Sequence, residues 1–541
     1  MVWAGAVLSA GLLELPFPLA GPLPAWRAVF AWFGLAPLLC AVLSRSTVED
    51  PRPLRRSFLI AYLSGVLWYI GNCYWIYATM LIHGGLPPLV SVLLLIGYSL
   101  VQGLYFGLFG LAVMLIRRST GSLRLSLAAA PVLWAALELA GSRITSVPWD
   151  QLGYSQVDNT LVNQLAPWTG VYGISFLLVA ANALIAGGFL LPCCSGKRMA
   201  ERHIWGGCGV LLLAIGSLGL SIAPPQPPAT ATAMLVQPNL DVAAANNWNG
   251  PEWDRQIAAL TKLAGEQCNS YLAGIPETGA PQGETACPPS PTPPELVAWP
   301  ESPAPFFEQD GRFLQAMNGL AQTERAPLIV GGVGMDISPG DRFWNEYNSA
   351  MVFSADGRRV GRYDKIHLVP FGEFIPYKNL LFFARKLTTR VGETTRGRER
   401  KVFRIGGHHY GVFICYESVF ADEVRHFAQL GAEVLVNISD DGWYGDTSAP
   451  WQHLNMARMR AIENRRWILR DTNNGITAAI DPYGRVRQSI PRHAVDVLPA
   501  AYGFRSDLTF YTVHGDVFAW LCLIFALAVV GWSAGKPRSL R

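Results

Sequence analysis

The chain has 541 residues, of which 51% are hydrophobic and only 15% are charged. Soluble proteins carry about 25% charged residues, so this composition excludes a fully water-exposed protein and indicates that a large part of the chain contacts lipid. The formal net charge of +4 is small, and the basic residues lie in short clusters between apolar runs, which favours a membrane topology over a nucleic-acid-binding surface.

Eight apolar runs are long enough to cross roughly 30 Å of hydrocarbon as helices. They lie near residues 2–20, 26–44, 57–79, 88–116, 125–141, 167–192, 203–222 and 516–534. The first run resembles a signal peptide, but it lacks a basic start and contains Glu14, so we expect it to be retained as a helix. The sequence therefore predicts a transmembrane helical domain of seven spans over residues 1–222, and a last span with a tail over 516–541.

Basic residues on alternate connections predict the orientation of these spans. With a cytoplasmic N-terminus, the cytoplasmic connections and tail would contain Arg45, Arg52, Arg55, Arg56, Arg117, Arg118, Arg124, Lys197, Arg198, Arg202, Lys536, Arg538 and Arg541. The opposite short loops offer only Arg143. Under the positive-inside rule this asymmetry delivers residues 223–515 to the far side of the membrane and returns the tail to the cytoplasm.

Residues 223–515 alternate short β-rich runs with helical patterns, which predicts an α/β layered domain with functional groups at strand ends. We expect strands at 232–237, 296–300, 328–332, 349–355, 410–415 and 433–439. Helical patterns lie at about 250–266, 311–324, 418–430 and 449–465. The Asp356-Gly357 pair predicts a hairpin turn.

The stretch 267–294 is rich in Pro and Gly, fits neither period and predicts a surface insertion. It contains Cys268 and Cys287, which we expect to be disulfide-bonded because disulfides persist outside the cytoplasm. On the chain-entropy model this bond is worth roughly 3 kcal/mol. The nine cysteines show no CxxC or Cys/His ligand spacing, so the sequence predicts no metal site.

Three short motifs stand at predicted strand ends: WPES with Glu301, YDKIHLVPFGEF with Lys365, and ICYES with Cys415. Each is weak by itself, because a cysteine after an apolar strand is usually a buried core thiol, and the Glu and Lys also have ordinary structural interpretations. Together they supply a base, a cation and a nucleophile. We interpret the flanking His367 and His453 as structural hydrogen-bonding residues.

A nucleophilic cysteine needs a base or a nearby cation, because an ordinary thiol has a pKa near 8.5. Glu301 can accept the thiol proton and later return it as an acid. Lys365 can favour the thiolate of Cys415, and its ammonium can donate to the oxyanion of a tetrahedral intermediate together with the backbone N–H of Tyr416. The absence of a histidine from this set excludes a papain-like pair.

Glu301, Lys365 and Cys415, in these contexts, resemble the Glu-Lys-Cys triad of the nitrilase (carbon–nitrogen hydrolase) superfamily. Longer segments resemble its membrane branch, the apolipoprotein N-acyltransferase family: LVQPNL, HLVPFGEF, ICYE, PWQHLNMARMRAIE, TNNGITAAIDPYG and the GYSQ loop at 153–156. The resemblance covers nearly the whole chain. It implies a multi-span α-helical membrane domain of about eight helices in a bacterial inner membrane, with a periplasmic α/β nitrilase-like αββα sandwich domain.

The resemblance also implies a reaction. The thiolate of Cys415 would attack an acyl ester of a phospholipid such as phosphatidylethanolamine, release a lysophospholipid and leave a thioester. The α-amine of a diacylglyceryl-cysteine at an apolipoprotein N-terminus would then take the acyl chain in the second half of a ping-pong scheme. The implied partners are this lipid donor, the apolipoprotein acceptor and the bilayer, with no nucleic acid, metal or organic cofactor.

Carried over residue by residue, Glu373 and Glu417 would be supporting carboxylates that position Lys365 and the pocket, and Tyr416 would supply the oxyanion amide. One departure stands out, because Asp440 replaces the Asn that the family usually has in the segment SDDGWYG. Polar contacts near the pocket therefore cannot be transferred directly from the family.

Four aromatic residues are candidates for substrate binding: Trp248, Trp443, Phe382 and Phe383. Trp248 matches an active-site Trp of the family, although the nearby Trp253 is a competing match. Phe382 and Phe383 belong to the stretch 374–386, whose apolar run has flanking basic residues. We interpret this stretch as a mobile arm that dips into the membrane, the alternative being an ordinary buried helix.

Two other functions use the same sequence features. A membrane-tethered amidase or nitrilase-like hydrolase would need the same triad with water as acceptor, but a soluble substrate needs one anchor rather than eight spans. A lipid-binding scaffold without activity would be expected to lack at least one member of the triad, and all three are present.

Overall fold

The computed structural model describes residues 2–191, 196–242, 251–265, 294–301, 306–336, 344–374 and 394–535. The chain divides into two compact units. The first comprises Met1–Tyr77, Pro87–Pro224 and His514–Arg541, and the second comprises Ala78–Leu86 and Pro225–Val513. A short segment of the helical region, Ala78–Leu86, thus groups with the α/β unit.

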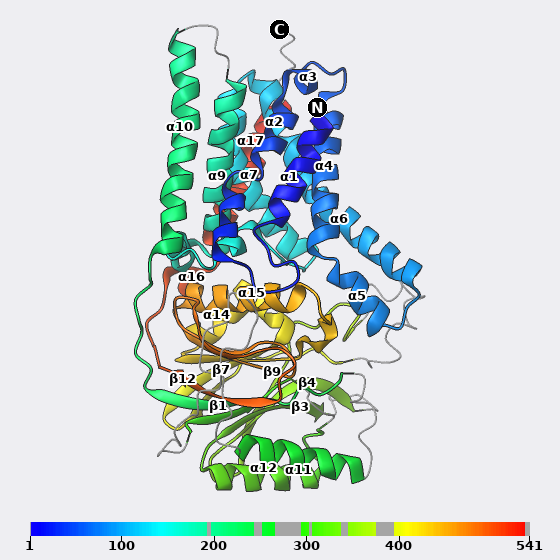
Figure 1. Cartoon of the computed structure of the whole chain (residues 1–541), viewed down its shortest axis with the longest axis vertical. Helices are drawn as coiled ribbons and strands as arrows, with labels where there is room; N and C mark the ends of the chain where they lie inside the picture. The colour runs from blue at the N-terminus through cyan, green and yellow to red at the C-terminus, as the bar shows by residue number, and fades with distance from the viewer. Residues whose placement is uncertain are drawn as a thin grey trace. The chain divides into compact units, whose positions relative to one another are not determined.

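The first unit is helical (Figure 1). Its longer helices are α1 (Val2–Glu14), α2 (Ala36–Leu43), α4 (Pro53–Asn72), α6 (Pro88–Thr120), α7 (Leu123–Ile144), α9 (Val171–Leu190), α10 (Gly196–Leu218) and α17 (Val517–Gly535). The short helices are α3 (Arg45–Val48) and α8 (Ala166–Thr169), with 3-10 turns at Ala25–Trp32, Leu152–Gln156, Val162–Leu165 and Gly219–Ser221. Helix α5 (Trp75–Ile82) runs from this unit into the second.

The prediction of a multi-span helical domain is confirmed, with fewer spans than expected. Within the described residues, six helices are long and apolar enough to cross a membrane, or seven if the pair α4 and α5, bent by 49°, is one span. The first predicted span is short, because α1 has 13 residues and ends at Glu14, just before Pro16 and Pro18. Proline lacks the N–H that would continue the helix.

The second unit contains two six-stranded sheets. One has the order β12-β1-β2-β3-β4-β5 and the other β11-β10-β9-β8-β7-β6. The strands are β1 (Ala231–Gln237), β2 (Leu296–Trp299), β3 (Leu328–Asp336), β4 (Asn345–Phe353), β5 (Arg359–Asp364), β6 (Val402–Ile405), β7 (His408–Ile414), β8 (Val434–Ser439), β9 (Trp467–Thr472), β10 (Thr477–Ile480), β11 (Val486–Ile490) and β12 (Asp496–Tyr502).

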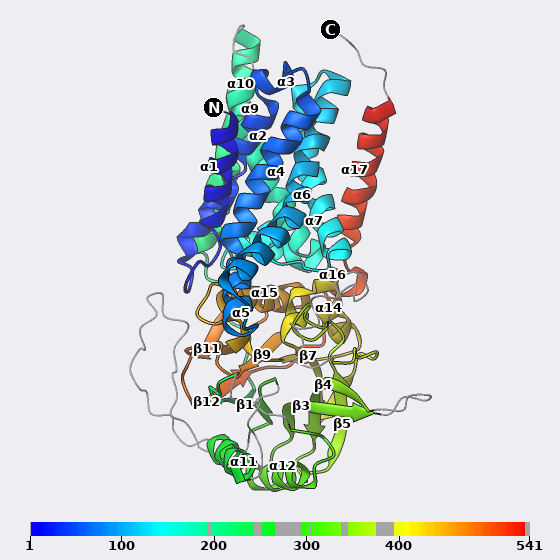
Figure 2. The same cartoon turned by 90° about the vertical axis from the view of Figure 1, so that its right-hand side faces the viewer.

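Helices cover the outer faces of both sheets, as Figure 2 shows. Helices α11 (Pro251–Gly265) and α12 (Gly311–Glu324) pack on the first sheet, and α14 (Ala421–Gln429) and α15 (Ala449–Asn464) pack on the second. The two sheets pack against each other, since strand β1 of the first sheet contacts strand β9 of the second. These four layers confirm the predicted αββα sandwich. The short α16 (Phe510–His514) precedes α17.

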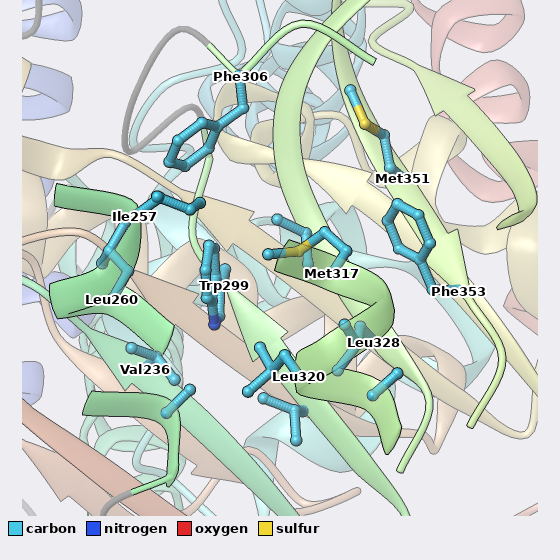
Figure 3. Packing of buried hydrophobic residues seen from close by; sticks show 14 of the residues in the cluster. Val236, Ile257, Leu260, Trp299, Phe306, Met317, Leu320, Leu328, Met351 and Phe353 are labelled. Carbon is cyan, nitrogen blue, oxygen red and sulfur yellow. The ribbon is translucent and has the colours of Figure 1, made fainter. Parts of the chain in front are cut away.

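One hydrophobic core lies between the first sheet and its helices (Figure 3). Phe313, Met317 and Leu320 repeat at the helical spacing of three and four along α12, and all three are buried. They meet Trp299 of β2 and Leu328 of β3 in the same cluster. The periodicity that predicted a helix over 311–324 is therefore also the reason that this helix covers the sheet.

All six expected strands are present, and the hairpin predicted at Asp356-Gly357 joins β4 to β5, with a backbone bond from Gly357 N–H to Ser354 O of 2.8 Å. Six further strands, β5, β6 and β9–β12, were not predicted. The helix predicted from residue 418 begins at Ala421 instead, because Cys415–Val419 forms a 3-10 turn, η7.

Asp471 of β9 is an unusual core residue, because its carboxyl group is fully buried. Burial raises the pKa of its carboxyl well above the usual value, and nearby backbone N–H groups offset only part of this. Because the pKa of this carboxyl is higher in the folded than in the unfolded state, the folded protein is most stable with respect to this group below about pH 4. The free energy of unfolding then falls as pH rises, by up to about 1.4 kcal/mol per pH unit.

We therefore expect Asp471→Ala to melt at a higher temperature than the unsubstituted protein at pH 8, with the difference shrinking toward pH 5. Melting curves of both proteins across this range check the prediction. Asp254→Ala is a suitable control, because the Asp254 side chain is 62% exposed and its ion-pair partner Arg312 keeps its charge over this range. A constant difference at all pH values would show that the carboxyl does not titrate in the core.

Candidate active site

Three strand ends meet in the second unit. Glu301 follows β2, Lys365 follows β5 and Cys415 follows β7, and these side chains are nearly completely buried. Lys365 Nζ donates to Glu301 Oε1 at 2.9 Å, although the two residues are 64 positions apart. The charges of both residues act on the Cys415 thiol. The structure thus brings together the three residues that the sequence singled out.

Lys365 lies between two carboxylates. Its Nζ is 2.9 Å from Glu301 Oε1 and 3.0 Å from Glu373 Oε2, and Asn348 Nδ2 donates to both glutamates at 2.7 Å. Burial lowers the pKa of Lys365, but the two carboxylates outweigh this and hold it well above its ordinary value. Lys365 therefore remains a cation, and the group of Glu301, Lys365 and Glu373 carries one excess negative charge when all three are ionised.

Sequence reasoning missed Asn348, which joins the same two carboxylates as Lys365. It lies in β4, and its carbonyl accepts a hydrogen bond of 2.9 Å from the Lys365 backbone N–H. An asparagine in a strand of mixed polarity carries no local signal of this role. Only the pairing of β4 with β5 places it beside the lysine.

Cys415 sits in a left-handed conformation with φ of 48°, which is uncommon for a residue other than glycine. Glu417, two residues later, holds this turn, because its Oε2 accepts from Ile414 N–H at 2.7 Å and its Oε1 from Ile366 N–H at 2.6 Å. Its Oε1 also accepts from the Tyr363 hydroxyl at 2.8 Å. Glu417 therefore ties the cysteine turn to the segment that carries Lys365, whereas Glu373 contacts the lysine side chain itself.

The Cys415 thiol is protonated at rest. Burial raises its pKa well above the ordinary value, and the charge of Glu301 raises it further. The charge of Lys365 acts in the opposite direction but does not outweigh them. The arrangement therefore requires a base that takes the thiol proton during attack, rather than a preformed thiolate.

Asp440, the first of the two acidic residues in the segment SDDGWYG, contacts Glu301 through the backbone. Its N–H donates to Glu301 Oε2 at 2.9 Å. Its carboxyl accepts from Gly442 N–H at 3.0 Å and from Asn473 Nδ2 at 3.1 Å. Burial, and then the nearby charge of Glu301, raise the pKa of Asp440 to about 8.

This raised pKa gives a testable pH dependence. Stability contributed by the protonated carboxyl is present below about pH 4 and is lost as pH rises through about 8. We expect the melting temperature of Asp440→Asn, relative to the unsubstituted protein, to increase from pH 5 to pH 8 and to level off above it. Thermal denaturation at half-unit pH steps measures this. A difference without pH dependence would contradict the assignment.

The aromatic candidates fall in different places. Trp443 lies in the 3-10 turn η8 (Asp441–Tyr444), is 37% exposed, and has its ring centroid 5.6 Å from that of His83, in the segment Ala78–Leu86 of the same unit. Trp253 of α11 packs in the hydrophobic core beside the first sheet, with its ring centroid 5.8 Å from that of Phe306. It is therefore part of the hydrophobic core of the first sheet.

Several sequence-based predictions lie outside the described residues. These are Trp248, Phe382, Phe383, the arm beyond Phe374, the Cys268–Cys287 disulfide and the basic residues of the C-terminal tail.

Comparisons with known proteins agree with the sequence motifs. Residues 232–501 match the carbon-nitrogen hydrolase family, and residues 9–184 match the apolipoprotein N-acyltransferase N-terminal domain. An apolipoprotein N-acyltransferase of Geobacter metallireducens is 33% identical over 99% of this chain and 95% of its own length. Another, of Pseudomonas syringae pv. tomato, is 30% identical over 90% of this chain and 89% of its own length.

Among solved structures, Saccharomyces cerevisiae Nit3, a member of the nitrilase superfamily, is similar with a TM-score of 0.35 and 16% identity. The match covers 52% of this chain and 93% of Nit3.

Proposed function

Because this chain belongs to the apolipoprotein N-acyltransferase family, we propose that it transfers an acyl chain from a membrane phospholipid to the N-terminal amine of an apolipoprotein through a thioester on Cys415. The donor is a phosphatidylethanolamine-like lipid, and the acceptor is a diacylglyceryl-cysteine. The observation that carries the proposal is the buried Lys365, held by Glu301 and Glu373 at a strand end beside the Cys415 thiol.

In the first half-reaction, Glu301 takes the thiol proton while Cys415 Sγ attacks the ester carbonyl of the phospholipid. The carbonyl oxygen becomes an oxyanion, to which the Lys365 ammonium and the Tyr416 N–H donate. When the intermediate collapses, the C–O bond of the ester breaks and Glu301 returns the proton to the leaving oxygen. A lysophospholipid departs, and the acyl chain remains on sulfur.

In the second half-reaction, the acceptor amine attacks the thioester carbonyl and Glu301 takes a proton from its nitrogen. The C–S bond breaks, and the thiolate regains that proton from Glu301. The amide product leaves, and the protonated thiol is restored. The carboxylate of Glu301 therefore acts as base and as acid in both half-reactions. The Lys365 ammonium beside it balances its negative charge in each of them.

The proposal places the chain in a bacterial inner membrane with residues 223–515 in the periplasm. Its support is the asymmetry of basic residues between alternate connections. Alkaline phosphatase joined after residue 224 should be active in cells, and the same reporter joined at residue 541 should be inactive. The reverse pattern would overturn this orientation.

A hydrolase that passes the acyl chain to water would use the same side chains. The match of residues 9–184 to the N-terminal domain of the acyltransferase family favours the transferase. The two functions differ in what discharges the thioester.

Mass spectrometry of the purified protein tests both donor and nucleophile. Incubation with phosphatidylethanolamine should add one acyl mass to the peptide that contains Cys415, and Cys415→Ser should show no thioester. Addition of a diacylglyceryl-cysteine peptide should discharge the adduct and yield an N-acylated peptide. An adduct on another residue would overturn the nucleophile, and discharge at the same rate without the peptide would favour the hydrolase.

A further inference from the structure

A buried histidine contacts the backbone of the candidate nucleophile. His453 lies in α15, and its Nε2 is 3.1 Å from the carbonyl oxygen of Cys415. On the other side of the ring, Nδ1 is 2.9 Å from Asp441 Oδ1 and 3.0 Å from Arg470 Nη2. None of these three side chains is exposed to solvent.

The surroundings of His453 select which ring nitrogen carries a proton. Arg470 Nη2 donates to Asp441 Oδ2 at 2.7 Å, so this pair balances its own charge. Burial, and then the charge of Arg470, lower the pKa of His453, and the nearby Asp441 carboxylate acts in the opposite direction. The carbonyl of Cys415 can only accept, so its contact of 3.1 Å requires a proton on Nε2 of His453. Nδ1 lies between the Asp441 carboxylate, which can accept from it, and the Arg470 guanidinium, which can donate to it.

The Cys415 carbonyl, which accepts the hydrogen bond from His453, belongs to the same peptide group as the proposed oxyanion donor. The carbonyl of Cys415 and the N–H of Tyr416 are parts of the same peptide bond, which is planar and trans, so they point in opposite directions. Anchoring the carbonyl therefore sets the direction of the N–H. The anchor also matters because Cys415 has a φ of 48°, a conformation that costs energy in a residue with a side chain.

We propose that His453 is a positioning residue that holds the Cys415 carbonyl through its Nε2–H and thereby aims the Tyr416 N–H at the developing oxyanion. The inference rests on the proposed function of Cys415 as the acylated nucleophile. A hydrogen bond accepted by the carbonyl also polarises the N–H of the same peptide group and strengthens it as a donor. Asp441 and Arg470 act one step further away, by holding the ring in place through its Nδ1.

Two substitutions separate this function from simple packing. In His453→Gln the terminal amide reaches about as far as Nε2 and keeps a donor for the carbonyl. In His453→Asn the shorter amide reaches only as far as Nδ1 and leaves the carbonyl without that donor. Loss of one oxyanion donor typically slows a reaction by about 10²–10³. We expect this loss in the acylation rate of His453→Asn at saturating donor, with KM changed less than about threefold, and a loss below about tenfold in His453→Gln.

Alkylation of Cys415 by iodoacetamide distinguishes a positioning role from a packing role. If His453 only packs against the cysteine turn, its substitution should slow alkylation and acylation equally. Alkylation needs the thiol but forms no oxyanion, so His453→Asn should slow it far less than it slows acylation. Equal losses in both reactions, or equal acylation losses in both variants, would overturn the proposal. If phospholipid fails as a donor, acylation by a p-nitrophenyl ester provides the same comparison between the variants. Failure of the proposed phospholipid reaction can thus be distinguished from failure of the proposed role of His453.

A measurement on the unsubstituted protein covers the case in which His453→Asn does not fold. The ¹⁵N chemical shifts of the ring nitrogens, assigned from the signals that disappear in His453→Gln or from selective labelling, report the tautomer. We expect a protonated Nε2 from pH 6 to pH 8. A ring protonated on Nδ1 alone would overturn the proposal.

Discussion

Replacement of Glu301 by Gln should lower the rate of Cys415 acylation at pH 7 by about 10²–10⁴, the usual contribution of a general base. The amide cannot accept the thiol proton, and the thiol is protonated at rest because burial and the charge of Glu301 raise its pKa. Single-turnover formation of the acyl-enzyme, followed by mass spectrometry, measures this rate directly.

Part of this loss should be recovered as pH rises. The Glu301 charge itself raises the pKa of the Cys415 thiol, so its removal lets the thiol ionise at a lower pH beside the remaining Lys365 charge. Hydroxide from solution can then remove the thiol proton in place of the carboxylate. Acylation rates of Glu301→Gln between pH 7 and pH 10 should rise with pH more steeply than those of the unsubstituted protein.

Glu324→Gln is a suitable control, because this carboxyl lies at the end of α12, away from the site. It should leave the rate and its pH dependence unchanged. If Glu301→Gln shows no recovery at alkaline pH, the carboxylate does more than accept a proton. Its bond from the Asp440 N–H, at 2.9 Å, would then be the first contact to test.

Replacement of Lys365 by Met should abolish acylation and also destabilise the fold by about 3–5 kcal/mol at neutral pH, the usual effect of breaking a buried ion pair. Glu301 and Glu373 would remain as two buried carboxylates on one asparagine, Asn348, without the cation between them. The acylation loss includes an oxyanion donor, worth about 10²–10³ by itself, and alkaline pH should not restore it.

The stability loss should shrink as pH falls, because at acid pH one carboxyl can take up a proton in place of the missing charge. Unfolding followed at pH 5 and at pH 8 checks this sign. The double variant Lys365→Met/Glu373→Gln should regain part of the stability but none of the acylation, since it removes one of the two unpaired charges. Lys401→Met, at an exposed lysine, should change neither property. Equal recovery of the acylation rate at alkaline pH in Lys365→Met and Glu301→Gln would contradict a role of Lys365 as oxyanion donor. Lys365 would then act only on the pKa of the Cys415 thiol.

The sequence determined the parts of this protein that depend on local periodicity. Apolar runs predicted the membrane helices, since the length of a helix in hydrocarbon depends only on the residues along it. The alternation of strands and helices predicted the α/β unit, and the spacing of Phe313, Met317 and Leu320 predicted α12. Strand β9 was missed, because a fully buried strand that contains charged residues such as Arg470 and Asp471 lacks the alternating pattern.

The distances and charges within the candidate site follow from the tertiary structure alone, because they depend on residues far apart in the chain. Asn348 joins two carboxylates through the pairing of β4 and β5, and Glu417 reaches the segment of Lys365 rather than its side chain. The resting protonation of Cys415 depends on burial and on two opposing charges, Glu301 and Lys365, from separate strand ends. Motifs identify such groups, but their distances and exposure to water set their charge, and these exist only once the sheets have formed.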